Sequence, residues 1–376
     1  MKHKLIYGLR LASAAMQLGV VFFLSSISVN SLGSYSFATA LLAIVMQAVQ
    51  FEGNQLAIGG LVQADRLRRI CATTNILWIA VTLATIGYFS GRPDVLVFTL
   101  LFILNLTTEW VVNLSTFEDR LVKNEKQFLN KLSLKIGVMD VALPLTLILW
   151  IYTTGGSGYY VISGLFTVAI LFFSIRYVGV ALSFSKMALP AFNFTYGVVL
   201  KRLDSMFIRV FTGITLGSNV LGVIQPLMSV ARASTILTPT WININFSGSL
   251  QDAAQSNSRI VQTLKTLGLS YTVYIVFGLI LFYGFSMFEG YNYDLTLCFA
   301  AVFVFGNQNT KAVLRSLNIM QERLGWNNIL INTGIVAKCI GCYLALSFGI
   351  KGILVVCLVV DLATICVVSL YLQKKV

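Results

Sequence analysis

The sequence predicts an all-α polytopic membrane protein of about 12 transmembrane helices in two six-helix halves, and three observations support this prediction. First, 57% of the 376 residues are hydrophobic and only 11% are charged. Second, long apolar runs recur along the whole chain. A hydrocarbon core about 30 Å thick requires ~20 residues of helix, and backbone groups in lipid must be hydrogen-bonded within their own segment. Third, Lys and Arg gather on alternate connections between the runs.

The apolar runs place the expected helices in order along the chain, and turn-prone segments separate them. Examples are "SGRPD" at 90–94, "TTGGSG" at 153–158 and "EGYNYD" at 289–294. None of these connections is long enough to form a soluble domain. We expect helices at residues 7–30, 35–58, 70–89, 94–116, 133–153, 158–181, 194–215, 218–246, 267–287, 294–319, 328–349 and 351–372.

The distribution of basic residues predicts the orientation of these helices. With a cytoplasmic N-terminus, the inner connections hold the basic clusters at 66–69, 120–135, 259–265 and 374–375, whereas the outer connections hold only Arg92 and Lys351. This asymmetry follows the positive-inside rule for a multi-pass protein with both termini in the cytoplasm. The net charge of +13 is therefore explained by the membrane surface, and nucleic acid is not expected as a partner.

A short motif predicts an internal repeat. Leu32-Gly33-Ser34 lies after the first apolar run and Leu216-Gly217-Ser218 after the seventh. We expect each to form the tight hairpin that opens its half, with glycine supplying the backbone freedom. An even number of spans lies between them, so the halves are predicted to be parallel repeats, with domains at 1–186 and 187–376.

Catalytic and metal-binding motifs are not found in the sequence. His3 is the only histidine, and no catalytic triad, phosphate loop or metal-ligand spacing occurs. The pair Cys339-x-x-Cys342 is interpreted as two small apolar residues on a buried helix. We therefore expect neither an enzyme nor a cofactor.

Charged residues inside the expected helices are the candidates for function, because each costs about 2.5–3.5 kcal/mol at a helix centre on insertion scales. We expect them to line a polar cavity, to pair, or to extend to the interface. Gln308, Lys311 and Arg315 follow one another at helical spacing, as do Arg10 and Gln17. The basic set is Arg10, Lys201, Arg202, Arg209, Arg232, Lys311, Arg315 and Lys338, and the acidic set is Glu52, Glu109, Asp140, Asp204 and Asp361.

The excess of basic over acidic residues in this set indicates an anionic substrate, for which the arginine fork suits phosphate. For Arg10, Arg315 and Lys201, extension to the cytoplasmic interface is the alternative. Asp204 is within reach of Lys201 three residues before it. Glu109, Asp140 and Asp361 either neutralise neighbouring cations or bind a coupling ion.

Two segments resemble a known family. "LGSYSFATALLAIVMQAVQFEG" at 32–53 and "KRLDSMFIRVFTGITLGSNVLGVIQPLMSVA" at 201–231, together with a lone Arg in the first span, resemble the Wzx-type bacterial polysaccharide flippases. These belong to the multidrug, oligosaccharidyl-lipid and polysaccharide exporter superfamily. The second hairpin reads Ser-Asn where the family pattern has Ser-Tyr, and the chain is shorter than many members.

The resemblance implies a V-shaped pair of six-helix bundles around a central polar lumen in the cytoplasmic (inner) membrane. It implies transport of an undecaprenyl-diphosphate-linked oligosaccharide, a unit of O-antigen, capsule or exopolysaccharide, to the outer leaflet. Membrane lipids, a glycan polymerase and the chain-length machinery would be its partners. Carried over, Arg10 and Gln17 would line one wall, and Arg202, Asp204, Arg209, Arg232, Lys311, Arg315 and Lys338 the other.

Two other functions remain open at this point. A multidrug or cation antiporter of the same superfamily would share the repeat, but its cavity should be acidic. A polytopic glycosyltransferase or polymerase would need a catalytic cluster or a sizeable outer loop, and neither is present in the sequence.

Overall fold

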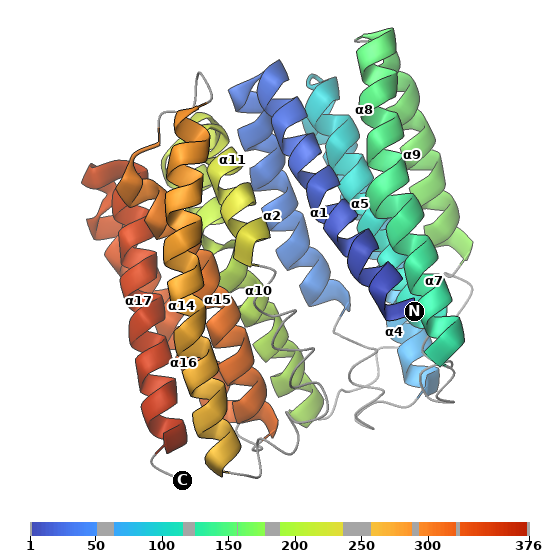
Figure 1. The fold of residues 1–376 in the computed structure, drawn as a ribbon. Helices are drawn as coiled ribbons and strands as arrows, with labels where there is room; N and C mark the ends of the chain where they lie inside the picture. Colours follow the sequence, from blue (N-terminus) through green and yellow to red (C-terminus); the bar gives the residue numbers. More distant parts are fainter. Residues whose placement is uncertain are drawn as a thin grey trace. The chain divides into compact units, whose positions relative to one another are not determined.

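The fold is taken from a computed structural model, and the residues described are 2–50, 64–115, 125–155, 157–176, 189–235, 257–287, 293–320 and 324–373. These residues are almost entirely helical, and with α7, η1 and α8 counted as one bent helix they form twelve long helices. The all-α, twelve-helix prediction is confirmed, and the chain is a polytopic membrane protein. The helices are drawn in sequence colours in Figure 1.

The contacts divide the chain into two compact units. Unit 1 consists of Met1–Val199 with Leu221–Val223, and unit 2 of Leu200–Val220 with Ile224–Val376. The predicted boundary at 186/187 lies outside the described residues. The V-shaped pairing and the central lumen stay predictions.

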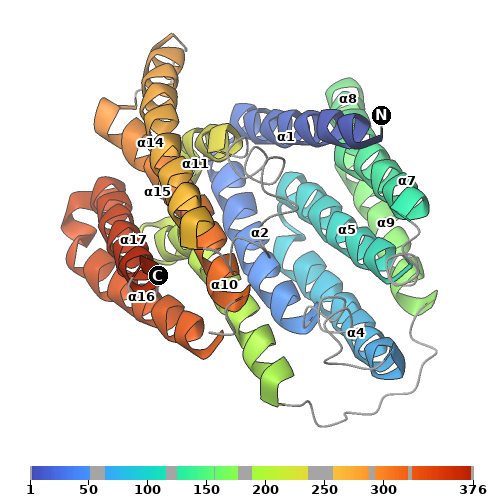
Figure 2. The same ribbon diagram turned by 60° about the horizontal axis from the view of Figure 1, so that its bottom comes forward.

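Unit 1 contains six of the twelve helices. They are α1 (Lys2–Ile27), α2 (Val29–Gln50), α4 (Ala64–Phe89), α5 (Pro93–Ser115), the bent helix, and α9 (Ser157–Arg176). The bent helix consists of α7 (Glu125–Lys135), the π-helix η1 (Ile136–Ala142) and α8 (Leu143–Thr154). α5 packs against α2, α4, α7 and α9 (Figure 2). Its side chains from Val95 to Leu101 are all buried, as expected for a helix that is apolar on every side.

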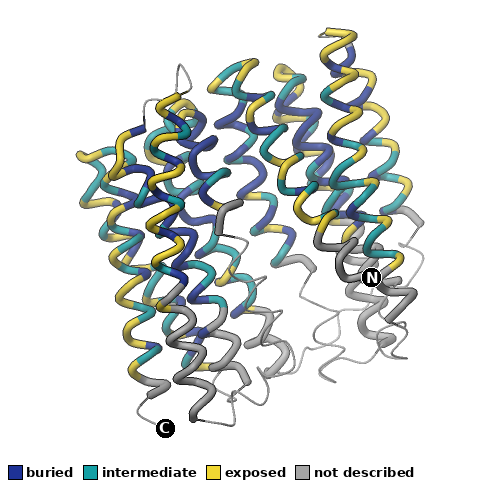
Figure 3. Tube along the Cα trace, in the orientation of Figure 1, coloured by how far each residue is buried: buried dark blue, intermediate teal, exposed yellow. Residues whose placement is uncertain are grey.

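Unit 2 is formed by most of α10 (Leu189–Thr215) and of α11 (Gly217–Thr235), together with four further helices: α14 (Asn257–Ser286), α15 (Leu295–Met320), α16 (Leu324–Leu344) and α17 (Gly349–Gln373). α15 packs against α14, α16 and α17. The approach of α14 to α15 is close, since a Cβ atom on Gly306 would lie 2.4 Å from the Tyr274 ring. A small residue at such a contact is typical of helix packing in membranes. Buried residues are dark blue in Figure 3.

Four described stretches are apolar and long enough by themselves to cross a membrane: Gly8–Ile27, Val29–Gln47, Asn130–Thr154 and Leu346–Leu370. Other helices carry charges within their apolar runs. α10, for example, holds Lys201, Arg202, Asp204 and Arg209 between hydrophobic residues. A composition test alone therefore misses such a helix, although it belongs to the bundle.

The predicted pair of hairpins is only half right. Leu216 lies between α10 and α11, and Gly217 has φ +84°, a conformation that glycine adopts without strain. In the first half, Leu32-Gly33-Ser34 lies inside α2, and the break between α1 and α2 is at Ser28. The Leu32 N–H donates to the Ser28 carbonyl, so the helix has already begun at this point. Gly33 is therefore not the turn residue.

Asp294 directly precedes α15. Its carboxylate accepts a hydrogen bond of 2.8 Å from the Leu297 N–H, which is the arrangement of an N-cap. It also forms an ion pair with Lys351 near the start of α17. The hydrogen bond from Lys351 holds the pKa of the Asp294 carboxyl below its usual range.

Candidate functional site

Four buried charges meet inside unit 2, each from a different helix. Asp204 lies on α10, Lys311 on α15, Lys338 on α16 and Asp361 on α17. Lys311 Nζ lies 2.7 Å from Asp204 Oδ2 and 2.5 Å from Asp361 Oδ1. Lys338 Nζ lies 2.7 Å from Asp204 Oδ1 and also 2.7 Å from Asp361 Oδ1. Each ammonium group thus bridges both carboxylates; these residues are called the Lys–Asp quartet below.

The quartet is withdrawn from solvent. The side chains of its members are at most 5% exposed, and Asp361 is completely buried. Met206, Phe207 and Ile208, which lie within four residues of Asp204 on α10, are also buried. Lys338 Nζ also lies 5.9 Å from the centroid of the Phe207 ring, a cation–π distance.

The two carboxylates of the quartet contact the ammonium groups through different sets of oxygen atoms. Asp204 contacts one ammonium with each oxygen, whereas Asp361 contacts both ammonium groups through Oδ1. Asp361 Oδ2 is buried and has no hydrogen-bond partner among the described groups. A buried carboxylate oxygen without a donor is costly, and this one is an unused acceptor inside the site.

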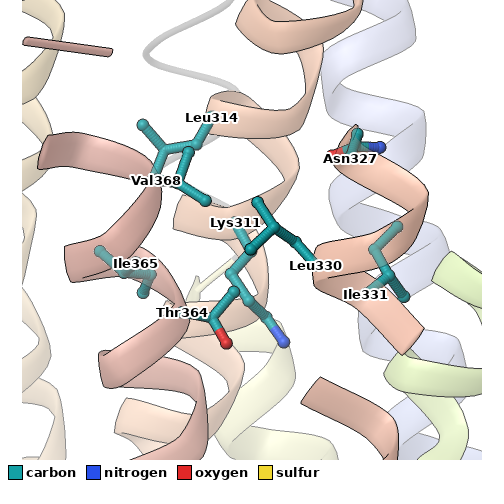
Figure 4. A pocket seen from close by; sticks show the side chains of 8 residues that line it. All are labelled: Lys311, Leu314, Asn327, Leu330, Ile331, Thr364, Ile365 and Val368. Atoms are coloured by element: carbon teal, nitrogen blue, oxygen red, sulfur yellow. The ribbon is translucent and has the colours of Figure 1, made fainter. Parts of the chain in front are cut away.

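A small pocket lies beside the quartet, and Lys311 is one of its lining residues. Lys311 reaches it from α15, as Figure 4 shows, and the other lining residues come from α15, α16 and α17. They are mostly apolar: Leu314, Asn327, Leu330, Ile331, Thr364, Ile365 and Val368. The pocket is too apolar in lining to be a phosphate site by itself.

A second charged cluster lies in unit 1, where the helix bends. Lys135 Nζ is 2.9 Å from Asp140 Oδ1 and 3.1 Å from Oδ2. The Asn105 amide of α5 donates to the same Oδ1 at 2.6 Å, which ties the bend to the central helix of the unit. Glu109 is more distant, at 4.0 Å from Lys135 Nζ, and its side chain is 56% exposed.

The π-helix explains why Lys135 and Asp140 meet. In an α-helix, residues five apart lie about 140° apart around the axis, so their side chains diverge. A π-helix joins residues five apart by its own hydrogen bonds, such as that from the Leu143 N–H to the Val138 carbonyl. Pro144 follows at the start of α8, and its ring would clash with the Asp140 carbonyl in a regular α-helix. The wider turn avoids that clash and aligns the ion pair.

Neither a protein-family model nor a curated protein matches the sequence. Among solved structures, the chain is similar to the inward-facing conformation of a multidrug resistance MATE family transporter of the MOP superfamily. The TM-score is 0.59 at 14% identity, covering 96% of this chain and 94% of that one. The outward-facing conformation of such a transporter gives a TM-score of 0.50 at 11% identity, covering 100% and 94%. The chain has the MATE transporter fold.

Within this MATE-like fold the candidate residues fall into two groups. Lys311, Lys338, Asp204 and Asp361 form the buried quartet, and Asp140 pairs with Lys135. The other candidates with described side chains are at least partly accessible: Arg10, Gln17, Glu109 and Arg232 are exposed, and Arg202, Arg209 and Gln308 are of intermediate burial. The side chain of Arg315, on α15, and the whole of Glu52 lie outside the described residues.

The structure adds contacts that the sequence did not indicate. Asp204 binds lysines of α15 and α16, and the expected contact with Lys201, whose side chain is exposed, stays a prediction. Sequence reasoning placed Lys135 in a cytoplasmic segment and did not consider Asn105. One feature of the sequence could have indicated the pairing of Lys135 with Asp140. Pro144 lies four residues after Asp140, inside an expected membrane helix.

The described residues contain no group of three His, Cys, Asp or Glu side chains that could hold a metal ion. Cys342 and Cys357 were not expected to meet, yet their sulfur atoms lie 3.8 Å apart between α16 and α17. Both are buried free thiols.

Proposed function

We propose that this protein is a membrane transporter that moves a diphosphate-linked oligosaccharide lipid from the cytoplasmic to the outer leaflet of the bacterial cytoplasmic membrane. The MATE-like fold supports transport. The choice of an anionic substrate rests on one observation. Among the positively charged candidates, two lysines are buried and neutralised by carboxylates, whereas the arginines are at least partly accessible.

The Lys–Asp quartet sums to zero, so it leaves the positive excess at membrane depth to other residues. In unit 2 these are Arg232, exposed in the last turn of α11, and Arg202 and Arg209, partly exposed on α10. A guanidinium group donates two parallel hydrogen bonds to phosphate oxygens and keeps its charge, which suits a diphosphate. We assign substrate binding to these arginines of unit 2.

The test is translocation of a fluorescent undecaprenyl-diphosphate saccharide in proteoliposomes, read as the fraction of label that an external quencher reaches. The triple variant Arg202→Gln, Arg209→Gln, Arg232→Gln should lower the rate at least about tenfold, because three charge-assisted contacts are lost. Lysine at the same positions should restore part of it.

Arg92→Gln provides the matched control, since Arg92 also carries a guanidinium but lies in a connection and donates to Ser34 Oγ. It should transport at the wild-type rate. Wild-type rates in the triple Gln variant, with equal reconstitution, would contradict the proposal.

A cation-coupled multidrug antiporter is the second candidate. The buried carboxylates Asp204 and Asp361 and the partly buried Asp140 favour it, because such groups can carry a coupling proton or cation. It predicts efflux of cationic dyes, lost on substitution of these carboxylates and insensitive to the arginines. Dye efflux and lipid translocation measured on the same proteoliposomes separate the two functions.

A further inference from the structure

The Lys–Asp quartet has the composition of a cation site that already contains its cations. Asp204 and Asp361 both contact the same two nitrogen atoms, so their carboxylates face one shared volume. Two carboxylates buried together repel each other and cannot both stay ionised unless positive charge lies between them. Here that charge is supplied by Lys311 and Lys338 Nζ.

A lysine ammonium group is a compact monovalent cation on a flexible stem. It carries the same charge as Na⁺ or K⁺, and carboxylate oxygens are ligands that such hard cations also accept. Because it is covalently attached, it stays at high effective concentration and does not exchange with the solution. A dissolved cation therefore competes poorly for these oxygens while both lysines are present.

Asp361 Oδ2 indicates what would happen if one ammonium group were removed. This oxygen is buried and has no hydrogen-bond partner among the described groups. Without Lys338, Oδ1 of Asp361 and Oδ1 of Asp204, each 2.7 Å from Nζ, would border the vacated position. These two oxygens, with Oδ2 of the same Asp361 carboxylate as a further acceptor, offer oxygen ligands to a monovalent cation in this buried place.

We propose that Lys311 and Lys338 are the resident cations of a buried dicarboxylate site in unit 2, so that wild-type unit 2 binds no exchangeable metal cation, and that loss of either ammonium group opens a site for Na⁺ or K⁺. Only one consequence of this inference rests on the proposed function. If the protein is a transporter, its transport is not coupled to a metal cation at Asp204 and Asp361. Cation binding itself is measured without substrate.

The experiment follows the thermal unfolding of the purified full chain in detergent, in NaCl or KCl against choline chloride at equal ionic strength. Lys338→Met should gain about 2–4 °C in Tm when Na⁺ or K⁺ exceeds its dissociation constant about tenfold, and nothing in choline chloride. The wild-type protein should not respond.

The matched control is Lys338→Met with Asp361→Asn, which removes one charge of each sign and leaves the Lys311–Asp204 pair intact. It should be insensitive to the cation. If Lys338→Met does not fold in any salt, Lys311→Met vacates the other bridging position and carries the same test.

Two results would overturn the proposal. One is a wild-type Tm that rises with Na⁺ or K⁺ and loses this response in Asp361→Asn, since a metal cation would then occupy the site already. The other is a folded Lys338→Met or Lys311→Met variant that gains no stability from either cation. Either result would leave lipid translocation by the wild-type protein unaffected, so the two proposals fail separately.

Discussion

Asp204 contacts two ammonium groups from two other helices, and this environment determines what its substitution should cost. All four members of the quartet are nearly inaccessible to solvent, so water cannot screen a charge that loses its partner. Breaking a buried ion pair by removing one partner is far more damaging than replacing both. The effect of a substitution here therefore depends on the charge balance that it leaves.

Asp204→Asn should lower the free energy of unfolding by about 3–5 kcal/mol, because two buried ammonium groups are left with one carboxylate. Adding Lys311→Met restores neutrality and keeps the Lys338–Asp361 contact of 2.7 Å. The double variant should therefore be more stable than Asp204→Asn alone. The comparison needs the unfolding of both single variants, the double variant and wild type in one denaturant series. Losses that simply add would show that the quartet is not coupled.

At the scale of single residues, the sequence located the charged positions but not their partners. Asp204, Lys311, Lys338 and Asp361 were all recognised as costly at membrane depth, since that inference needs only an ionisable residue in an apolar run. Lys201 was the partner considered for Asp204 because it is close in the chain. The observed partners are 107 and 134 residues away, and no local spacing indicates them.

Among the helices, the bend between α7 and α8 shows how one proline changes the side chains before it. Pro144 cannot follow four residues of regular α-helix without a clash, and η1 provides a wider turn in front of it. Asp140 is thereby brought to Lys135 and to Asn105 of α5. A π-turn at such a position is commonly retained for function, which agrees with the candidate role of Asp140.

The packing of α16 on α17 can be tested through Cys342 and Cys357. Their sulfur atoms are 3.8 Å apart, so a small rotation of the side chains brings them to bonding distance. In a variant that retains only these two cysteines, diamide should oxidise both thiols to a disulfide and itself take up the two electrons and two protons. Mass spectrometry of the digest should show the joined peptides, two hydrogen masses lighter than the reduced pair.

A variant that retains only Cys339 and Cys357 is the control for this cross-link. Cys339 lies on α16 about one turn before Cys342 but is exposed. It should not cross-link within the chain under the same conditions. Equal cross-linking of both pairs would contradict the described register of α16 on α17.

At the scale of the whole molecule, the proposed substrate charge makes the driving force testable. An inside-negative potential of ~100 mV favours outward movement of a charge of about −2, which releases roughly 4–5 kcal/mol. If the quartet contains its own cations, membrane potential is the simplest source of energy. Proteoliposomes with an imposed K⁺ diffusion potential should then accumulate the lipid in the outer leaflet, and the accumulation should follow the potential.

The competing possibility is ion entry coupled through Glu109, Asp140 or Asp361. It predicts net translocation at zero potential under a pH or Na⁺ gradient, and such a result would exclude the potential-only mechanism. Lys338→Met with Asp361→Asn is the informative variant, because it removes the Asp361 carboxylate without leaving an unmatched buried charge. Retained potential-driven transport in this variant would exclude Asp361 as the coupling group.

The sequence by itself determined the class of the protein, the number and approximate positions of its helices and the charged residues inside them. These properties are local, since apolar run length and the cost of a charge in lipid depend on a few consecutive residues. Tertiary structure decided the start of α2 at Val29, the π-turn before Pro144 and the pairing of each buried charge. The physical reason is that partners on different helices are set by the rotation and axial register of whole packed helices, which depend on residues far apart in the chain.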